Sequence, residues 1–85
     1  MKPTAILLLH CSDEQGIISD ITKFIRDNHG NIVYLDQYVD REDGMFFMRL
    51  EWELEKFTIP REKIEDIIST LYAKRYNMDF NLYFN

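Results

Sequence analysis

The residues best suited to ligand chemistry lie in one short loop, Ser12-Asp13-Glu14-Gln15-Gly16, between an apolar run and an amphipathic stretch. Ser12 and Gln15 have the spacing of a capping box, which satisfies the free N–H groups at the start of a helix. Gly16 falls in the expected first turn, where glycine costs about 1 kcal/mol relative to alanine. It therefore indicates a close approach to the backbone. The approaching group is either a neighbouring strand or a ligand held by the N–H groups of residues 13–17.

Side chains that could support catalysis or metal binding are few and scattered. His10 and His29 flank a predicted helix of about 15 residues, which spans roughly 22 Å, so they cannot share a site within one copy. Cys11 is the only cysteine and excludes an internal disulfide; a buried, inert thiol is its simplest interpretation. Four acidic residues match no cation-binding loop and indicate a solvated hairpin: Asp36, Asp40, Glu42 and Asp43. We therefore predict no catalytic residue, no metal site and no cofactor in this chain.

Composition and charge narrow the class of protein further. The chain has 85 residues, 46% of them hydrophobic, which is enough for one domain with its own core. Its formal net charge is −5, which argues against binding to a nucleic acid backbone. The sequence contains neither a signal peptide nor an apolar run long enough to span a bilayer, so no membrane partner is expected. With the single cysteine, these features predict a reducing compartment, the cytoplasm.

The elements that must position the loop follow from hydrophobic periodicity. A stripe at helical spacing predicts a helix over residues 13–29, ended by Gly30 at its C′ position: Ile17, Ile18, Ile21, Phe24 and Ile25. A second stripe predicts a helix that begins at Pro60. Strands are expected over residues 4–10, 31–40, 45–54 and 77–84. Asp43-Gly44 is a hairpin signal between the second and third strands.

The resulting order is βαββαβ, and each helix has one apolar stripe, so both helices must cover the same face of one sheet. With right-handed crossovers we predict an α+β, ferredoxin-like sandwich over residues 1–85, with sheet order 4-1-3-2. This fold hosts many functions. A metallochaperone would need paired cysteines in the first loop, and an acylphosphatase would need an arginine there. An RNA-recognition domain would need exposed basic and aromatic residues on the middle strands, for which only Phe47 and Arg49 are candidates.

Two stretches of the sequence resemble the ACT domain, a small-molecule sensing module. They are Asp13-Glu14-Gln15-Gly16-Ile17-Ile18 and Gly30-Asn31-Ile32. Two further stretches are similar to the N-terminal domain of formyltetrahydrofolate deformylases: Asp36-Gln37-Tyr38-Val39-Asp40 and Gly44-Met45-Phe46-Phe47-Met48-Arg49-Leu50-Glu51-Trp52. This resemblance covers nearly the whole chain.

The resemblance implies a regulatory domain that senses an amino acid. The matching ligand residues are Ser12, Asp13, Gln15, Gly16, Ile17 and Asn31. It also implies a homodimer or higher oligomer of ACT domains. In the deformylase family a following formyltransferase-like domain, with an Asn, a His and an Asp, hydrolyses 10-formyltetrahydrofolate to formate and tetrahydrofolate, which supplies formate for purine synthesis. Catalysis is thus expected outside this chain.

Two alternatives stay open: a stand-alone amino-acid-binding regulator, and a structural oligomerisation module with an empty loop. Self-association also has a basis in the residues. The stretch 31–40 alternates poorly between apolar and polar, and two helices cannot bury Tyr34, Tyr38 and Val39 together. We therefore expect an edge strand whose outer surface meets another apolar surface.

Overall fold

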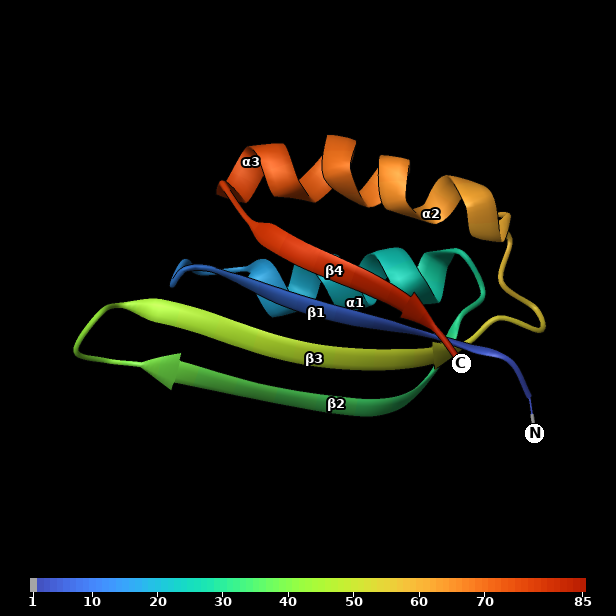
Figure 1. Cartoon of the computed structure of the whole chain (residues 1–85), viewed down its shortest axis with the longest axis horizontal. Helices are drawn as coiled ribbons and strands as arrows, with labels where there is room; N and C mark the ends of the chain where they lie inside the picture. The colour runs from blue at the N-terminus through green and yellow to red at the C-terminus, as the bar shows by residue number, and fades with distance from the viewer. Residues whose placement is uncertain (1) are drawn as a thin grey trace.

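The structure, a computed structural model, describes residues 2–85 (Figure 1). Its elements follow the predicted order. They are β1 (Thr4–Ser12), α1 (Ile17–Asp27), β2 (Asn31–Asp40), β3 (Met45–Glu53), α2 (Arg61–Ile68), a π-helical segment (Ser69–Ala73), α3 (Lys74–Tyr76) and β4 (Asp79–Phe84). The predicted β2 has the observed bounds. The second helix is interrupted by the π-helical segment, and β4 begins two residues later than predicted because Asn77 adopts a left-handed conformation (φ 51°).

The four strands form one antiparallel sheet in the order β2-β3-β1-β4, which confirms the predicted 4-1-3-2 arrangement. β1 lies between β3 and β4, with Leu7 opposite Leu50 on one side and Leu82 on the other. The central position of β1 explains its apolar character on both faces. The ferredoxin-like fold is therefore confirmed.

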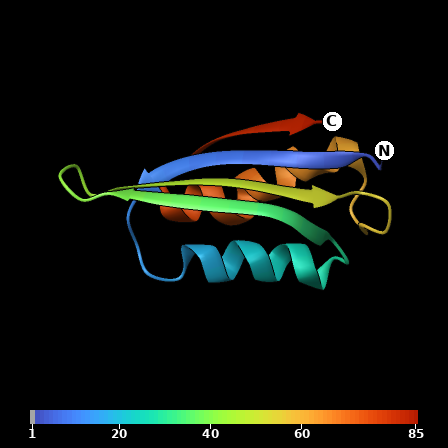
Figure 2. The same ribbon diagram turned by 90° about the horizontal axis from the view of Figure 1, so that it is seen from below.

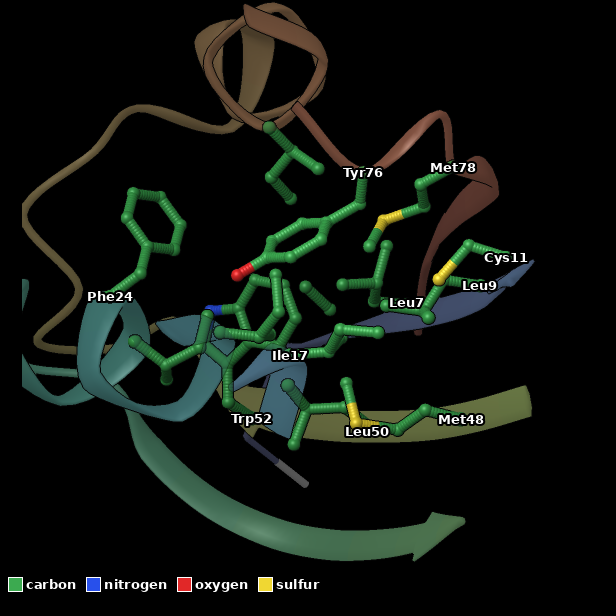
Figure 3. Packing of buried hydrophobic residues seen from close by; sticks show 14 of the residues in the cluster. Leu7, Leu9, Cys11, Ile17, Phe24, Met48, Leu50, Trp52, Tyr76 and Met78 are labelled. Carbon is green, nitrogen blue, oxygen red and sulfur yellow. The ribbon is translucent and has the colours of Figure 1, made fainter. Parts of the chain in front are cut away.

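The core lies between the sheet and the two helices. Alternate residues of β1 and β3 point into it, including Leu7, Leu50 and Trp52, which are fully buried (Figure 3). The apolar stripe of α1 meets them, and Ile64 and Ile68 of α2 complete the cluster. Figure 2 shows the strands as one layer with α1 beneath it. The opposite face of the sheet has no helix over it, so strand residues of that parity stay exposed or half-buried, apart from Thr4, which is 8% exposed and donates its hydroxyl hydrogen bond to Glu51.

Strict alternation along β2 predicts that Ile32 shares a face with Tyr34, Asp36 and Tyr38, and a β-bulge corrects this. Ile32 pairs with Trp52, but Tyr34 pairs with the next residue of β3, Glu51, so Val33 is the extra residue. Ile32 therefore points to the helices together with three residues that strict alternation places on the opposite face: Leu35, Gln37 and Val39. Tyr34 and Tyr38 lie on the uncovered face and are 47% and 63% exposed. The poor alternation that the sequence shows is thus the signature of the bulge on an edge strand.

The two ends of α1 also differ from prediction. The helix begins at Ile17 rather than Asp13, and no side chain caps it, so the predicted capping box is wrong. Ser12 belongs to β1 instead. At the other end His29 takes the left-handed conformation (φ 66°) that the prediction gave to Gly30. Gly30 is required for packing, because a Cβ there would lie 2.6 Å from Ile25 Cγ2.

Candidate ligand-binding site

The loop between β1 and α1 is held by backbone hydrogen bonds at both ends. The Asp13 N–H donates to the Gly44 carbonyl oxygen (2.8 Å), which ties the loop to the β2–β3 hairpin. The Asp20 N–H donates to the Gly16 carbonyl oxygen (2.9 Å), the first bond of α1. Within residues 2–85, the N–H groups of Ile17, Ile18 and Ser19 have no backbone acceptor and open the positive end of the helix. These groups, and not that of Asp13, are available to an anion.

Gly16 is glycine because of its backbone conformation. Its φ of 95° lies in the left-handed region, where a Cβ is disfavoured. A Cβ would meet only the Tyr76 hydroxyl, at 3.9 Å. Of the two predicted causes of a close approach, a neighbouring strand is therefore wrong, and a ligand stays a prediction. Glycine here lets the chain turn sharply from the loop into α1 and present the free N–H groups.

A hollow of about 450 Å³ opens beside this helix start. Three predicted site residues line it: Asp13, Gly16 and Ile17. Further lining residues come from the loop, the helix, β2 and β3: Glu14, Ile18, Ser19, Gln37, Val39 and Phe46. Ser12 and Gln15 are exposed in the same segment but lie outside this lining. The hollow therefore combines polar loop groups with an apolar wall.

Asn31 lies at the opposite end of α1. That helix has 11 residues and hence a length of about 16 Å. The Asn31 side chain donates to Glu53 Oε1 (2.8 Å) and borders a second hollow, of about 460 Å³, between α1 and the start of β2. One copy of the chain does not bring Asn31 to the Asp13–Gly16 loop. Only a second copy could contribute it there.

No local pattern in the sequence directly indicated the wall formed by Gln37, Val39 and Phe46. Phe46 and Val39 are paired across β3 and β2, and both point towards the helices. Gln37 is a polar residue on that face, between the apolar Leu35 and Val39. A polar side chain at a core-facing position of an edge strand was the one available hint.

Two acidic side chains beside Cys11 and a half-buried hydrogen bond at the start of α1 set the electrostatics of the loop. Burial raises the pKa of the Cys11 thiol, and the nearby Glu14 and Asp13 carboxylates raise it further. Cys11 is 2% exposed and thus held as an inert thiol. The buried Tyr76 hydroxyl, which points into the core in Figure 3, donates to the Asp20 carboxylate. This bond, followed by burial, raises the pKa of Tyr76 and ties α3 to the first turn of α1.

The two histidines lie apart from each other and from this hollow. His10 contacts Asp79 on the uncovered sheet face (Nε2–Oδ2 3.3 Å), and His29 Nδ1 lies 3.0 Å from the Thr58 hydroxyl. Across residues 2–85 we find no group of three His, Cys, Asp or Glu side chains placed to hold a metal ion. No helix in the described chain has both the length and the apolar character needed to cross a membrane.

The sheet order, the two helices on one face and the loop geometry define a small ferredoxin-like domain. The model of the ACT domain family matches residues 5–71, and the chain belongs to this family. The resemblance noted from Asp13–Ile18 and Gly30–Ile32 is therefore confirmed.

Similar proteins include several formyltetrahydrofolate deformylases. The chain is 37% identical to the one from Synechocystis sp. over 82 residues, which cover 96% of this chain and 28% of that protein. The crystal structure of the deformylase from Pseudomonas syringae has the same fold (TM-score 0.92, 23% identity, 99% of this chain and 28% of that chain). An ACT domain protein from Streptococcus pneumoniae also has this fold (TM-score 0.79, 18% identity, 98% and 90%). The chain thus spans about a quarter of the deformylases that it matches.

Proposed function

We propose that this chain is a regulatory and assembly domain that binds a free amino acid in the hollow beside the start of α1. The observation that supports it is the combination of groups in that hollow. Free N–H groups of Ile17, Ile18 and Ser19 suit a carboxylate. The carboxylates of Asp13 and Glu14 suit an α-ammonium group.

The apolar wall suits an apolar side chain on the ligand. Ile18 is 36% exposed, while Phe46 and Val39 form the floor on the sheet side. Covering such a wall contributes about 25 cal/mol per Å² of apolar surface removed from water. We therefore expect methionine or leucine to bind more tightly than glycine.

Calorimetric titration of the 85-residue chain with methionine, leucine and glycine tests this function. N-acetylmethionine lacks the ammonium group, and methionine amide lacks the carboxylate. Each should bind at least about tenfold more weakly than methionine, because each loses a charge-assisted hydrogen bond. If none of these amino acids binds at millimolar concentration, the domain is a structural module with an empty loop.

The assembly part of the proposal rests on β2. This strand has ten residues and one unpaired edge, and Leu35 at that edge is 40% exposed although it faces the helix side. An unpaired edge favours addition of another strand. Two copies of β2 joined antiparallel about a two-fold axis would form one continuous sheet.

Charge and the bulge select one register for this pairing. Centring the axis on Asp36 places Asp36 opposite itself, and centring it on Tyr38 places Asp36 opposite Asp40, so both registers are penalised by like charges. Centring it on Leu35 places the bulge at Val33 within the paired segment, where it would disrupt regular pairing. An axis at Gln37 avoids both problems. It brings Leu35 of a second copy opposite Val39, where it closes the open side of the amino-acid hollow.

This register predicts a specific cross-link. The double variant Leu35→Cys with Val39→Cys should form interchain disulfides under mild oxidation, because opposed Cβ atoms in an antiparallel pair lie about 4.5–5.5 Å apart. The matched control Asp36→Cys should not form a disulfide to its own copy. Sedimentation equilibrium should show dimers of the unmodified chain at tens of micromolar. A monomer at that concentration, or cross-linking of Asp36→Cys alone, would contradict this assembly.

We further propose that the parent protein is a cytoplasmic formyltetrahydrofolate deformylase, in which a separate domain hydrolyses 10-formyltetrahydrofolate and supplies formate for purine synthesis. The similarity to deformylases over 96% of the chain supports this. A stand-alone ACT regulator is the second candidate, supported by the Streptococcus pneumoniae protein, of which the fold covers 90%. The 85-residue chain itself should release no formate above background from 10-formyltetrahydrofolate. Formate release by the purified domain would overturn this assignment.

A further inference from the structure

The face of the sheet without helices, which we call the open face, carries the half-buried Leu8 and an unusual set of exposed side chains: Tyr34, Tyr38, Phe47, Arg49 and Tyr83. The four aromatic residues among them are between 40% and 63% exposed. Pairing along β2 would leave this face uncovered, because it extends the sheet in its own plane. The open face is thus a second surface, independent of the amino-acid hollow.

The strand registers place these side chains in neighbouring rows. Tyr38, Phe47 and His10 form one row, with ring centroids 6.2 Å and 5.8 Å apart. Asp36, Arg49 and Leu8 form the next row. The Arg49 guanidinium lies over the Tyr34 ring, 5.8 Å from its centroid. A shallow hollow of about 380 Å³ lies between the two rows.

This composition is typical of a protein-binding surface. Tyrosine and arginine, with tryptophan, dominate the residues whose truncation weakens protein complexes most. Tyrosine and phenylalanine supply contact area at a low cost in side-chain entropy. Arg49 has no ion pair within residues 2–85 and keeps its donors free for a partner.

Charge limits what can dock there. The strands also present to this face the carboxylates of Asp36, Asp40, Glu51, Glu53 and Asp79. The cations beside them are the Arg49 guanidinium and the Lys2 ammonium, which pairs with Glu53 (3.8 Å). A second copy stacked face to face would bring acidic side chains together. Nucleic acid phosphates and anionic lipid headgroups would be repelled in the same way. A cationic partner with an apolar ridge is the complementary one.

Shape indicates the form of that partner. Neighbouring strands lie about 4.8 Å apart, so the outer strands of a four-stranded sheet are separated by about 14 Å. A helix with its side chains is about 10–12 Å wide. We propose that the open face docks one amphipathic helix of another polypeptide segment, with apolar residues on the aromatic rows and lysine or arginine beside the carboxylates.

The 85-residue chain and three synthetic peptides test this docking surface. The probe is a peptide of about 18 residues with leucine on one helical face and lysine on the other. The second peptide carries glutamate in place of lysine, and the third has the probe's composition in an order that is not amphipathic. The first should bind, gain helical circular dichroism and shift the amide signals of the open-face residues in nuclear magnetic resonance spectra. The other two should not bind.

Matched variants distinguish binding of the probe at the open face from nonspecific binding elsewhere on the domain. Phe47→Ser and, independently, Tyr38→Ser should weaken probe binding about tenfold. Leu71→Ser removes an equally exposed apolar side chain (48%) from the second helical region and should leave binding unchanged. Circular dichroism establishes that each variant is folded. Absence of binding, binding of the glutamate peptide, or equal binding by both open-face variants and the unmodified chain would overturn the proposal.

Discussion

Gly30→Ala should destabilise the domain by about 2 kcal/mol, because the added methyl group has no room in a packed core. A Cβ at this position would lie 2.6 Å from Ile25 Cγ2 and 3.0 Å from both Trp52 Cδ1 and Phe57 Cδ1. Ile25 and Trp52 are fully buried, so neither can move without disturbing the core cluster. Gly30→Val, which adds two further methyl groups at the same place, should lower the stability more than Gly30→Ala.

Gly44→Ala is the matched control for this prediction. Gly44 has a φ of 66° at the hairpin tip, and a Cβ there meets no atom within 4 Å. Its substitution by alanine should lower the free energy of unfolding by about 1 kcal/mol, because alanine is disfavoured in this backbone conformation. Asparagine, which tolerates the left-handed region, should restore most of this loss at Gly44 and none at Gly30. Urea unfolding measures both series. Equal losses for the two alanine variants would contradict the packing role of Gly30.

Patterns local in the sequence predicted most of the fold. The helical stripes of α1 and α2, the alternation in β3 and the Asp43-Gly44 hairpin each appear in the structure. Together they determine the sheet order, because two single-striped helices leave one way to cover the sheet. The bulge at Val33 was not predictable in this way. It depends on pairing with β3, and without it the faces of β2 are assigned one residue out of phase.

The start of α1 shows why the predicted capping box failed. Ser12 is drawn into β1, where it pairs with Met45, and the Asp13 N–H is committed to Gly44. These long-range contacts extend the strand past the position where local spacing begins the helix. Gly16 then makes the turn that a capping side chain would otherwise stabilise.

For the candidate site, the sequence identified the loop but not the surface opposite it. Asp13, Gly16 and Ile17 are local and match a family pattern, whereas Gln37, Val39 and Phe46 reach the hollow through strand pairing. Asn31 matches the same pattern but lies at the far end of α1. The family resemblance indicates which residue types belong to a ligand site. Whether these residues can contact the same ligand depends on their positions in the folded chain.

Gly16→Leu should abolish amino-acid binding, lowering the affinity about 30-fold or more, while the domain stays folded. Leucine at a φ of 95° is strained, at a cost of about 1–2 kcal/mol, which a domain of this size can tolerate. Relief of that strain would rotate the peptide that precedes Ile17 and misdirect the N–H groups meant for the ligand carboxylate. The new side chain would also occupy space at the edge of the hollow, which Gly16 lines. Each effect weakens binding by itself.

Gly44→Ala again provides the control, because it carries a backbone strain at a position that does not line the hollow, and alanine keeps the carbonyl oxygen that accepts from the Asp13 N–H. It should bind methionine like the unmodified chain, which separates loss of stability from loss of the site. Asn31→Ala makes a further distinction. If a second copy brings Asn31 to the ligand, this variant should weaken binding only at protein concentrations where dimers form, because a monomer holds Asn31 against Glu53 at the other end of α1. Calorimetry at two protein concentrations measures both effects. A folded Gly16→Leu variant that binds methionine normally would exclude the start of α1 as the ligand site, whatever the oligomeric state.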